Sequence, residues 1–141
     1  MKAEEMWNLY HKEKGSYQAW KFGTDPDALA ELVRTGQKRA TSSAYLIYEQ
    51  EKEPLPQEGE YNIILDAKEN AVCITRTNKV SVVPFIEVTE QYARREGEGD
   101  LSLEYWRRVH RSFFTQELAV HQIVFDENML VVCEEFEVVY P

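Results

Sequence analysis

Apolar and polar residues follow two spacings along this chain, and together they predict a mixture of helices and strands. Apolar residues spaced for one face of a helix occur at 3–14, from Pro26 to Gly36, at 89–95 and at 103–118. Apolar runs of strand length occur at 17–22, 42–48, 61–65, 71–75, 80–83, 85–88 and 129–140. Short strands separated by long connecting segments, some of them helical, predict an α+β fold. We expect a small, partly closed β-barrel with helices packed around it.

Turn residues mark the expected boundaries of these elements. Asp25 is a candidate N-cap, Pro26 takes the first helical position, and Gly36 is the candidate C′ residue of the same helix. Residues 66–70 join two β-rich runs as a hairpin loop. Pro84 is expected at a sheet edge or bulge. The charged residues 49–60 include two prolines and predict a surface connection.

The composition fits one domain over residues 1–141, with an N-terminal helix in residues 1–15 packed on it. A chain of 141 residues with 43% hydrophobic content can bury a core, and it is too short for two ordinary domains. Its apolar runs are shorter than a signal peptide or a membrane span requires, so we expect a cytoplasmic protein with no membrane partner. Cys73 and Cys133 lie in apolar segments without metal-ligand spacing, which predicts buried free thiols.

Lys38 and Thr41 are the first candidates for chemistry. They follow Gly36, so Lys38 is expected in the turn between a helix and a strand. A cation and a hydroxyl three residues apart can share a pocket if Lys38 is still in the turn, because positions 38 and 41 of a regular strand face opposite sides. The alternative is a helix cap followed by a solvated lysine.

Residues 96–100, Glu-Gly-Glu-Gly-Asp, form an acidic loop before the next helix. Crowded carboxylates are costly to ionise together, so one of them could have a raised pKa and act as a general acid or base. The alternative is a solvated acidic turn. Asp100 and Ser102 are both candidate caps for the helix that follows.

The helix at 103–118 presents two different faces. Its inward side is expected to carry Leu103, Trp106, Val109, His110 and Phe113. His110 on that side is either a hydrogen-bonded core residue or the border of a cleft. The outward residues Arg107, Arg108 and Arg111 are the only concentrated basic surface in a chain of net charge −9. Since this net charge opposes general binding of phosphate backbones, an RNA-binding role would depend on such a local patch.

Several common motifs are absent from the sequence. It contains no P-loop, no dinucleotide-binding glycine pattern, no His-Glu-x-x-His and no serine-hydrolase elbow. We therefore expect no dinucleotide or other cofactor and no metal.

The motifs together resemble the ASCH domain family. The resemblance covers roughly residues 17 to 140 and rests on the Gly36–Thr41 turn, the Val83–Val88 run, the 96–103 segment, Trp106 with His110 and Phe113-Phe114, and the closing 132–136 segment. It implies a PUA-like fold with a cleft where the Gly-x-Lys turn meets the acidic loop, and an RNA- or nucleoside-related role. The cleft residues it suggests are Trp20, Phe22, Gly36, Ser42, Trp106 and His110.

Some small bacterial relatives in this family are amidohydrolases that remove the acetyl group from N4-acetylcytidine with a lysine, a threonine three residues later and a glutamate. Lys38 and Thr41 match the first two positions. The acidic loop differs in length and sequence from that of the hydrolases, so Glu96 and Glu98 are both candidates for the third. Other relatives have been proposed as RNA-binding or nuclease domains, which keeps open a non-catalytic RNA-binding module using the arginines of the 103–118 helix.

A hydrolase of this kind would need an activated threonine. The base for its hydroxyl could be a neutral, partly desolvated Lys38 or a glutamate of the loop. A charged Lys38 would instead stabilise the oxyanion of a tetrahedral intermediate. Trp20, Phe22 and Trp106 could provide a stacking wall for a base.

Overall fold

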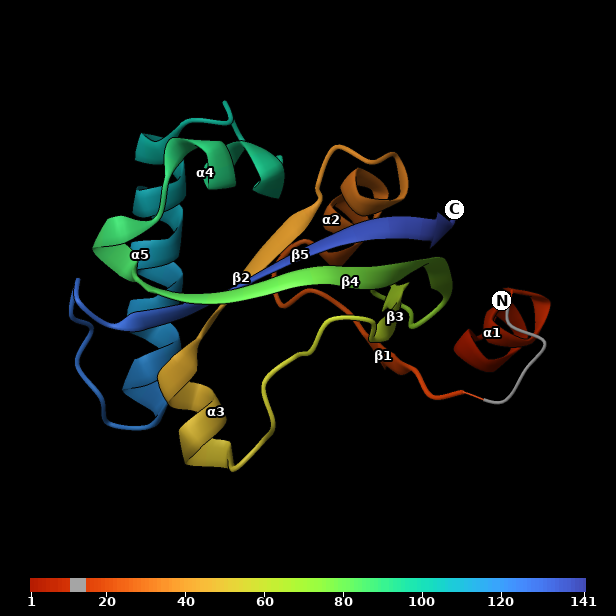
Figure 1. The fold of residues 1–141 in the computed structure, drawn as a ribbon, viewed down its shortest axis with the longest axis horizontal. Helices are drawn as coiled ribbons and strands as arrows, with labels where there is room; N and C mark the ends of the chain where they lie inside the picture. Colours follow the sequence, from red (N-terminus) through yellow and green to blue (C-terminus); the bar gives the residue numbers. More distant parts are fainter. Residues whose placement is uncertain (11–14) are drawn as a thin grey trace.

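A five-stranded mixed sheet, curved into a half-barrel, forms the centre of the protein in a computed structural model that describes residues 1–10 and 15–141. The strand order is β1-β3-β4-β5-β2, with β1 Gln18–Trp20, β2 Ala40–Ala44, β3 Tyr61–Leu65, β4 Ala71–Pro84 and β5 Leu130–Tyr140. Only β1 pairs in parallel, with β3; the other pairings are antiparallel. Figure 1 shows β4 and β5 running side by side across the molecule. The prediction of a PUA-like α+β fold is confirmed.

Five α-helices and one 3₁₀ turn complete the described fold. They are α1 Ala3–Tyr10, α2 Pro26–Arg34, α3 Tyr45–Glu51, η1 Phe85–Glu87, α4 Glu90–Glu96 and α5 Leu103–Val120. Side-chain hydroxyls cap α4 and α5, where Thr89 accepts from Tyr92 N–H and Ser102 accepts from Tyr105 N–H. Ser102, and not Asp100, is therefore the cap of α5. Asp25 has a left-handed backbone and makes no side-chain cap. Among the described residues, no helix has both the length and the apolar character needed to cross a membrane.

Neighbouring residues of β3 and β4 pack into two different hydrophobic cores, because successive side chains in a strand point to opposite faces. Ile64 and Cys73 pack under α2 with Ala30 and Val33. Their neighbours Ile63 and Ile74 pack on the other face with Met6 and Trp7 of α1. The 1–15 helix prediction holds for residues 3–10, while residues 11–14 lie outside the described residues. Cys73 and Cys133 are buried free thiols, as predicted.

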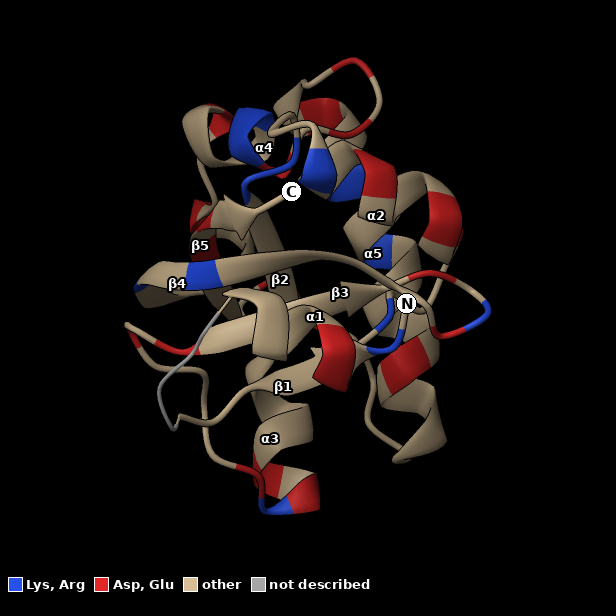
Figure 2. Ribbon diagram, turned by 90° about the vertical axis from the view of Figure 1, so that its right-hand side faces the viewer, with Lys and Arg blue, Asp and Glu red and all other residues tan. Residues whose placement is uncertain are grey.

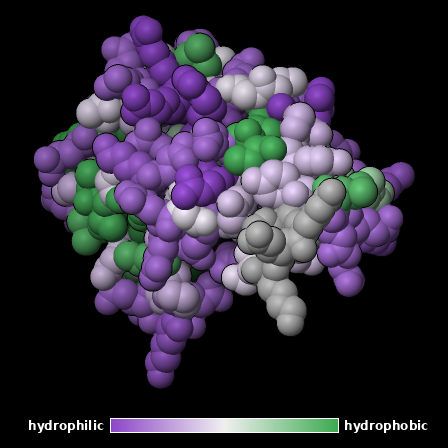
Figure 3. Space-filling model, turned by 45° about the vertical axis from the view of Figure 1, so that its right-hand side comes forward, coloured by the Kyte–Doolittle hydropathy of each residue, from purple (hydrophilic) through white to green (hydrophobic). Residues whose placement is uncertain are grey.

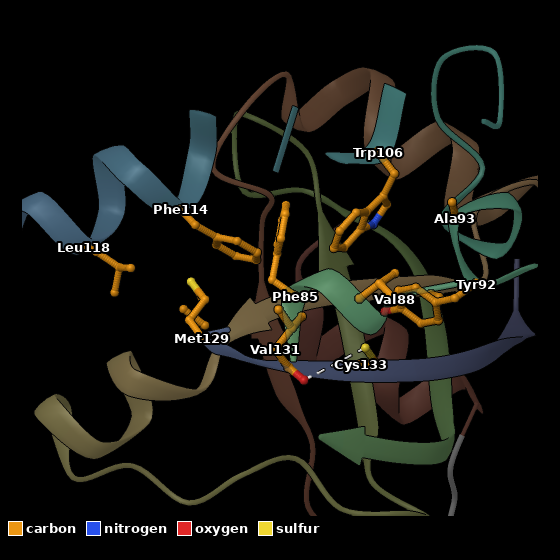
Figure 4. Close-up of a cluster of buried hydrophobic side chains, with 12 residues drawn as sticks. Phe85, Val88, Tyr92, Ala93, Trp106, Phe114, Leu118, Met129, Val131 and Cys133 are labelled. Carbon is orange, nitrogen blue, oxygen red and sulfur yellow. Dashed lines mark hydrogen bonds between the residues drawn. The ribbon is translucent and has the colours of Figure 1, made fainter. Parts of the chain in front are cut away.

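The third and largest core lies where α4, α5 and η1 cover the other end of the sheet. Phe85 is 1% exposed and packs against Trp106 and Phe114, with ring centroids 5.2 Å and 6.3 Å away (Figure 4). Phe114, fully buried, faces this core, whereas Phe113 is 38% exposed. The prediction that Phe113 faces inward is therefore wrong. At 3.6 residues per turn, Phe114 lies within the arc of α5 between the buried Trp106 and Leu118, and Phe113 lies outside that arc.

The strand predicted at 42–48 is a strand only for residues 42–44, which belong to β2, and the one predicted at 85–88 is not a strand. Residues 45–48 form the first turn of α3, whose Leu46 and Ile47 pack against the large core from a helix. A short apolar run has no period that separates the two structures, so tertiary packing decided this one. Residues 85–87 form the 3₁₀ turn that buries Phe85. The run 80–83 continues β4 without a break, so residues 71–84 are one strand.

The hairpin of β3 and β4 is confirmed, with Leu65 opposite Ala71. Pro84 ends β4, beyond the part that pairs with β3, so its missing N–H costs the sheet little. The surface connection predicted for 49–60 begins later, after α3 ends at Glu51. Figure 3 shows one mainly hydrophilic face on which apolar residues form separate small patches.

Candidate functional site

The turn between α2 and β2 buries a lysine. Gly36 follows the C-cap of α2 with φ +86°, and Lys38 N–H then bonds back to the Leu32 carbonyl at 3.0 Å. Lys38 therefore lies in the turn, as the sequence requires for convergence with Thr41, and β2 begins at Ala40. Its side chain points inward and is only 1% exposed. The alternative of a solvated lysine is wrong.

The Lys38 ammonium meets three oxygens at the end of α4 and just after it. Lys38 Nζ lies 3.0 Å from Glu96 Oε1, 3.3 Å from the Glu96 carbonyl and 2.8 Å from Glu98 Oε2. An ammonium has three N–H donors. All three are used, so a ligand reaches one of them only by replacing an existing acceptor.

The Glu96 carboxylate is fully buried and accepts from several directions. Besides Lys38, it accepts from the Ser42 hydroxyl and from Trp106 Nε1 at 2.6 Å. His110 Nε2 lies 3.4 Å from the same oxygen, and His110 Nδ1 lies 2.9 Å from the Trp106 carbonyl. The carboxylate is only 2% exposed and both of its oxygens are bound, so Glu96 holds β2, α4 and α5 together around Lys38.

Backbone contacts fix the two segments against each other. Arg39 N–H donates to the Arg95 carbonyl at 2.7 Å, and the side-chain Nε2 of Gln37 donates to the Gly97 carbonyl at 2.9 Å. Gly97 lies against the backbone of Gln37 and Lys38 so closely that a Cβ would collide with it. This close approach requires glycine, and it places Glu96 and Glu98 on either side of the lysine.

Both partners of the buried pair are charged. Burial alone would lower the pKa of Lys38, but the charges and hydrogen bonds of Glu96 and Glu98 outweigh it and raise the pKa. Burial alone would likewise raise the pKa of Glu96, but Lys38, then His110 and the Ser42 and Trp106 hydrogen bonds, lower it. The expectation of a raised pKa in the acidic loop is therefore wrong for Glu96. It is wrong for Asp100 too, whose pKa is lowered by hydrogen bonds from Ser102.

These shifts predict how stability depends on pH. The Glu96 contribution is complete above the unfolded-state pKa near 4.5 and is lost as the pH falls through the lower folded-state pKa. The Lys38 contribution is complete below about 10.5 and is lost as the pH rises through the higher folded-state value. We expect urea unfolding midpoints to be level near neutrality and to fall below about pH 4.5. A Lys38→Met/Glu96→Gln variant should show a shallower acid decline; an identical decline would contradict the assignment.

A cavity of about 470 Å³ opens beside this cluster. Its size is that of an ordinary small-molecule site. Phe22, Gly23 and Thr24 form one wall after β1, Thr41 and Ser42 contribute from β2, and α5 forms the opposite wall. Lys38 Nζ lies 5.6 Å from the centroid of the Phe22 ring, which gives an apolar surface next to the charges. The complete lining is Phe22, Gly23, Thr24, Leu29, Lys38, Thr41, Ser42, Glu96, Glu98, Arg108, Val109, His110, Ser112, Phe113 and Gln116.

The cavity gathers most, but not all, of the predicted site residues. Lys38, Thr41, Ser42, Glu96, Glu98, Phe22 and His110 line it. Trp20 lines a different cavity, packs edge-on against Phe22 and donates to Asn62. Gly36 shapes the turn and does not line the cavity. Trp106 is 2% exposed behind Glu96. Of the three aromatic residues predicted as a stacking wall, only Phe22 lines the cavity, because Trp20 and Trp106 pack into the fold around it.

The three arginines of α5 do not form one surface. Arg107 donates to the Ile86 carbonyl at 3.1 Å, and Arg111 pairs with Glu127 at 2.6 Å and lies over the rings of Phe85 and Phe125. Arg108 is exposed and, unlike Arg107 and Arg111, lines the cavity. Basic and acidic segments are interspersed in the molecule as a whole (Figure 2).

Two further residues of the site, Tyr92 and Gln37, were not predicted from the sequence. The buried Tyr92 hydroxyl donates to the Thr41 carbonyl at 2.7 Å and lies 3.0 Å from Ser42 Oγ, so it positions both cavity residues of β2. Burial raises its pKa well above the ordinary value, so it remains a phenol. Its place four residues before Glu96 puts it on the same face of α4, a signal that the sequence did contain. The Gln37 contact with Gly97 has no comparable signal.

The fold and the site define a class of protein: a PUA-like half-barrel in which a buried lysine–glutamate pair borders a small cavity. The ASCH domain model matches residues 18–140, and the chain belongs to the ASCH domain family. ASCH domains are in general RNA-binding PUA-like domains.

Two solved structures resemble the whole chain. An ASCH domain from Lactobacillus crispatus JV V101 is 33% identical, with a TM-score of 0.92 over 98% of this chain and 94% of that one. A protein from Enterococcus faecalis V583 is 37% identical, with a TM-score of 0.87 over 97% of this chain and 87% of that one. A search of curated proteins found no match.

Proposed function

We propose that the cavity binds a nucleoside, a modified base or an RNA end and hydrolyses an N-acyl amide of the N4-acetylcytidine kind. The observation that carries this proposal is the convergence of an ammonium, a threonine and a carboxylate, from Lys38, Thr41 and Glu98, on one cavity of about 470 Å³. Phe22 supplies a flat apolar wall on which a base can stack. The resemblance to acetylcytidine hydrolases at positions 38 and 41 points to the same reaction.

The charge state of Lys38 assigns the roles. Since its pKa is raised, Lys38 is a donor to a carbonyl oxygen or oxyanion and not the base. Glu96 is 2% exposed and already binds Lys38, Ser42 and Trp106, whereas the Glu98 side chain is 22% exposed in the cavity lining, so we assign Glu98 as the base for Thr41. The alternatives for the catalytic glutamate are thereby reduced to Glu98, while Glu96 positions Lys38.

The proposed reaction has two stages. The Thr41 hydroxyl attacks the acyl carbon and gives its proton to Glu98, while the Lys38 ammonium stabilises the oxyanion. Glu98 loses its negative charge in this step, which weakens its hold on Lys38 as the oxyanion needs that donor. The C–N bond then breaks, and the amine leaves with the proton from Glu98. Water hydrolyses the acyl-threonine by the same route and releases the carboxylic acid.

The test is to incubate the protein with N4-acetylcytidine and to measure the release of cytidine and acetate. Thr41→Val keeps the shape of the side chain and removes the nucleophile, so kcat should fall at least about a hundredfold. Glu98→Gln should lower kcat by about 10²-fold or more, as loss of a general base does. Thr35→Val and Glu104→Gln, at exposed positions outside the cavity lining, are the matched controls and should retain full activity. No turnover and no binding by the unaltered protein would end the proposal.

RNA binding along α5 is the less supported alternative. Arg107 and Arg111 are engaged by contacts within the protein, so the face that would follow an RNA backbone is largely neutralised. Family membership nevertheless makes RNA the natural source of the ligand. We therefore favour a modified base or an RNA end in the cavity over a long strand on the helix.

A further inference from the structure

We propose that Arg108 forms a phosphate subsite at the side of the cavity, so that the preferred ligand is a nucleotide or an RNA end and not a free nucleoside. This inference rests on the proposed function and specifies its substrate class. Arg108 lines the cavity that Lys38, Thr41 and Glu98 also line.

Arg108 differs from the other arginines of α5 in its partners. Arg107 and Arg111 each contact a protein oxygen. Within residues 1–10 and 15–141, no carboxylate lies within ion-pair distance of the Arg108 guanidinium, which rests over the Tyr105 ring at 5.5 Å. Arg108 acts electrostatically on Asp100, whose carboxylate accepts a hydrogen bond from Ser102 N–H at 2.9 Å. The exposed guanidinium keeps its bidentate donors for a ligand.

The wall around Arg108 carries other polar groups. Ser112 and Gln116 follow at spacings of four residues on the same face of α5, and both line the cavity. Gln116 donates to Ser112 Oγ at 3.5 Å, which leaves the serine O–H available as a donor. Thr24 adds a second hydroxyl to the cavity lining. A guanidinium with neighbouring hydroxyls is the donor set that phosphate oxygens require.

The distribution of charge sets the orientation of the ligand. At the Lys38 end, one ammonium faces the carboxylates of Glu96 and Glu98, so the net charge there does not favour an anion. A neutral acylated base fits that end because an amide offers both an acceptor and a donor. An anionic phosphate fits only beside Arg108. In a chain of net charge −9, the lining cation that has no carboxylate partner among the described residues decides where a phosphate is tolerated.

The test compares binding of cytidine, cytidine 5′-monophosphate and cytidine 3′-monophosphate by calorimetry at low ionic strength. None of these carries an acyl group, so binding is measured without turnover. One of the phosphates should bind about tenfold tighter than cytidine to the unaltered protein, the effect of one charge-assisted contact. In Arg108→Gln this preference should fall to less than about twofold, with cytidine affinity unchanged. The control Arg94→Gln changes an exposed arginine on α4 outside the cavity, and this variant should keep the preference for phosphate.

The outcomes separate this inference from the proposed reaction. Equal binding of cytidine and both phosphates, no binding of any of them, or a phosphate preference that survives Arg108→Gln would overturn the subsite. Arg108-dependent binding of a cytidine phosphate, together with an unreactive N4-acetylcytidine, would support the subsite and reject the hydrolysis. Hydrolysis of N4-acetylcytidine and its phosphates at equal kcat/KM would reject the subsite alone.

Discussion

Lys38→Met should destabilise the protein by about 3–5 kcal/mol, the cost of leaving a buried charge without its partner. The substitution keeps a similar side-chain volume but leaves the Glu96 carboxylate, 2% exposed, without the ammonium. Urea denaturation followed by tryptophan fluorescence measures the change. The double variant Lys38→Met/Glu96→Gln should recover much of the loss, because a neutral amide at 96 can still accept from Trp106.

The control for this experiment is Arg34→Met, which breaks the ion pair of Arg34 with Glu31 on the exposed surface of α2. This variant should unfold at nearly the same urea concentration as the unaltered protein, since solvent screens exposed pairs. A Lys38→Met variant as stable as Arg34→Met would mean that the buried pair is not charged in solution. The roles assigned to Lys38 and Glu98 would then have to be reversed.

Gly97→Ala is expected to have the second largest effect. The added Cβ would collide with the Gln37 carbonyl oxygen and lie 2.7 Å from its carbonyl carbon and 2.9 Å from Lys38 Cα. These are backbone atoms, so no change of side-chain rotamer can relieve the collision. Together with the cost of φ +69° for alanine, the expected destabilisation is about 2–4 kcal/mol. Because the loop must move, the contacts of Glu96 and Glu98 with Lys38 should loosen and activity should fall.

The Gly36→Ala variant distinguishes the cost of a left-handed backbone from the cost of a steric collision. Gly36 also has a positive φ, +86°, but a Cβ there would meet nothing within 4 Å. We expect about 1–2 kcal/mol of destabilisation from the backbone alone and an intact cavity. Equal losses of stability and activity in the two alanine variants would show that the close approach of Gly97 to the 37–38 backbone has no special role in the site.

Local chemistry accounts for the parts of the fold that the sequence predicted well. Pro26 and Gly36 bound α2, and the runs on either side of residues 66–70 pair as the predicted hairpin. In each case a proline, a glycine or a regular period acts within a few residues of the structure that it determines. The same kind of signal placed Lys38 in a turn and Thr41 in a strand.

Particular side chains show where local chemistry was insufficient. Tyr45–Tyr48 has the composition of a strand, yet α3 forms because Leu46 and Ile47 then reach the large core. Trp106 has the size of a stacking residue, yet it is buried with its N–H on Glu96. The different roles proposed for Glu96 and Glu98 depend on which carboxylate the fold buries, and two acids two residues apart in the sequence give no sign of that difference.

The sequence by itself determined the elements whose causes are local: the turns, the hairpin and the residue types available for chemistry. Only the tertiary structure decided the charge of Lys38, because burial and the approach of a carboxylate about sixty residues away oppose each other there. It also decided which arginine of α5 is left for a ligand. Electrostatic energies depend on the distances between atoms in space, and contacts between remote segments set those distances.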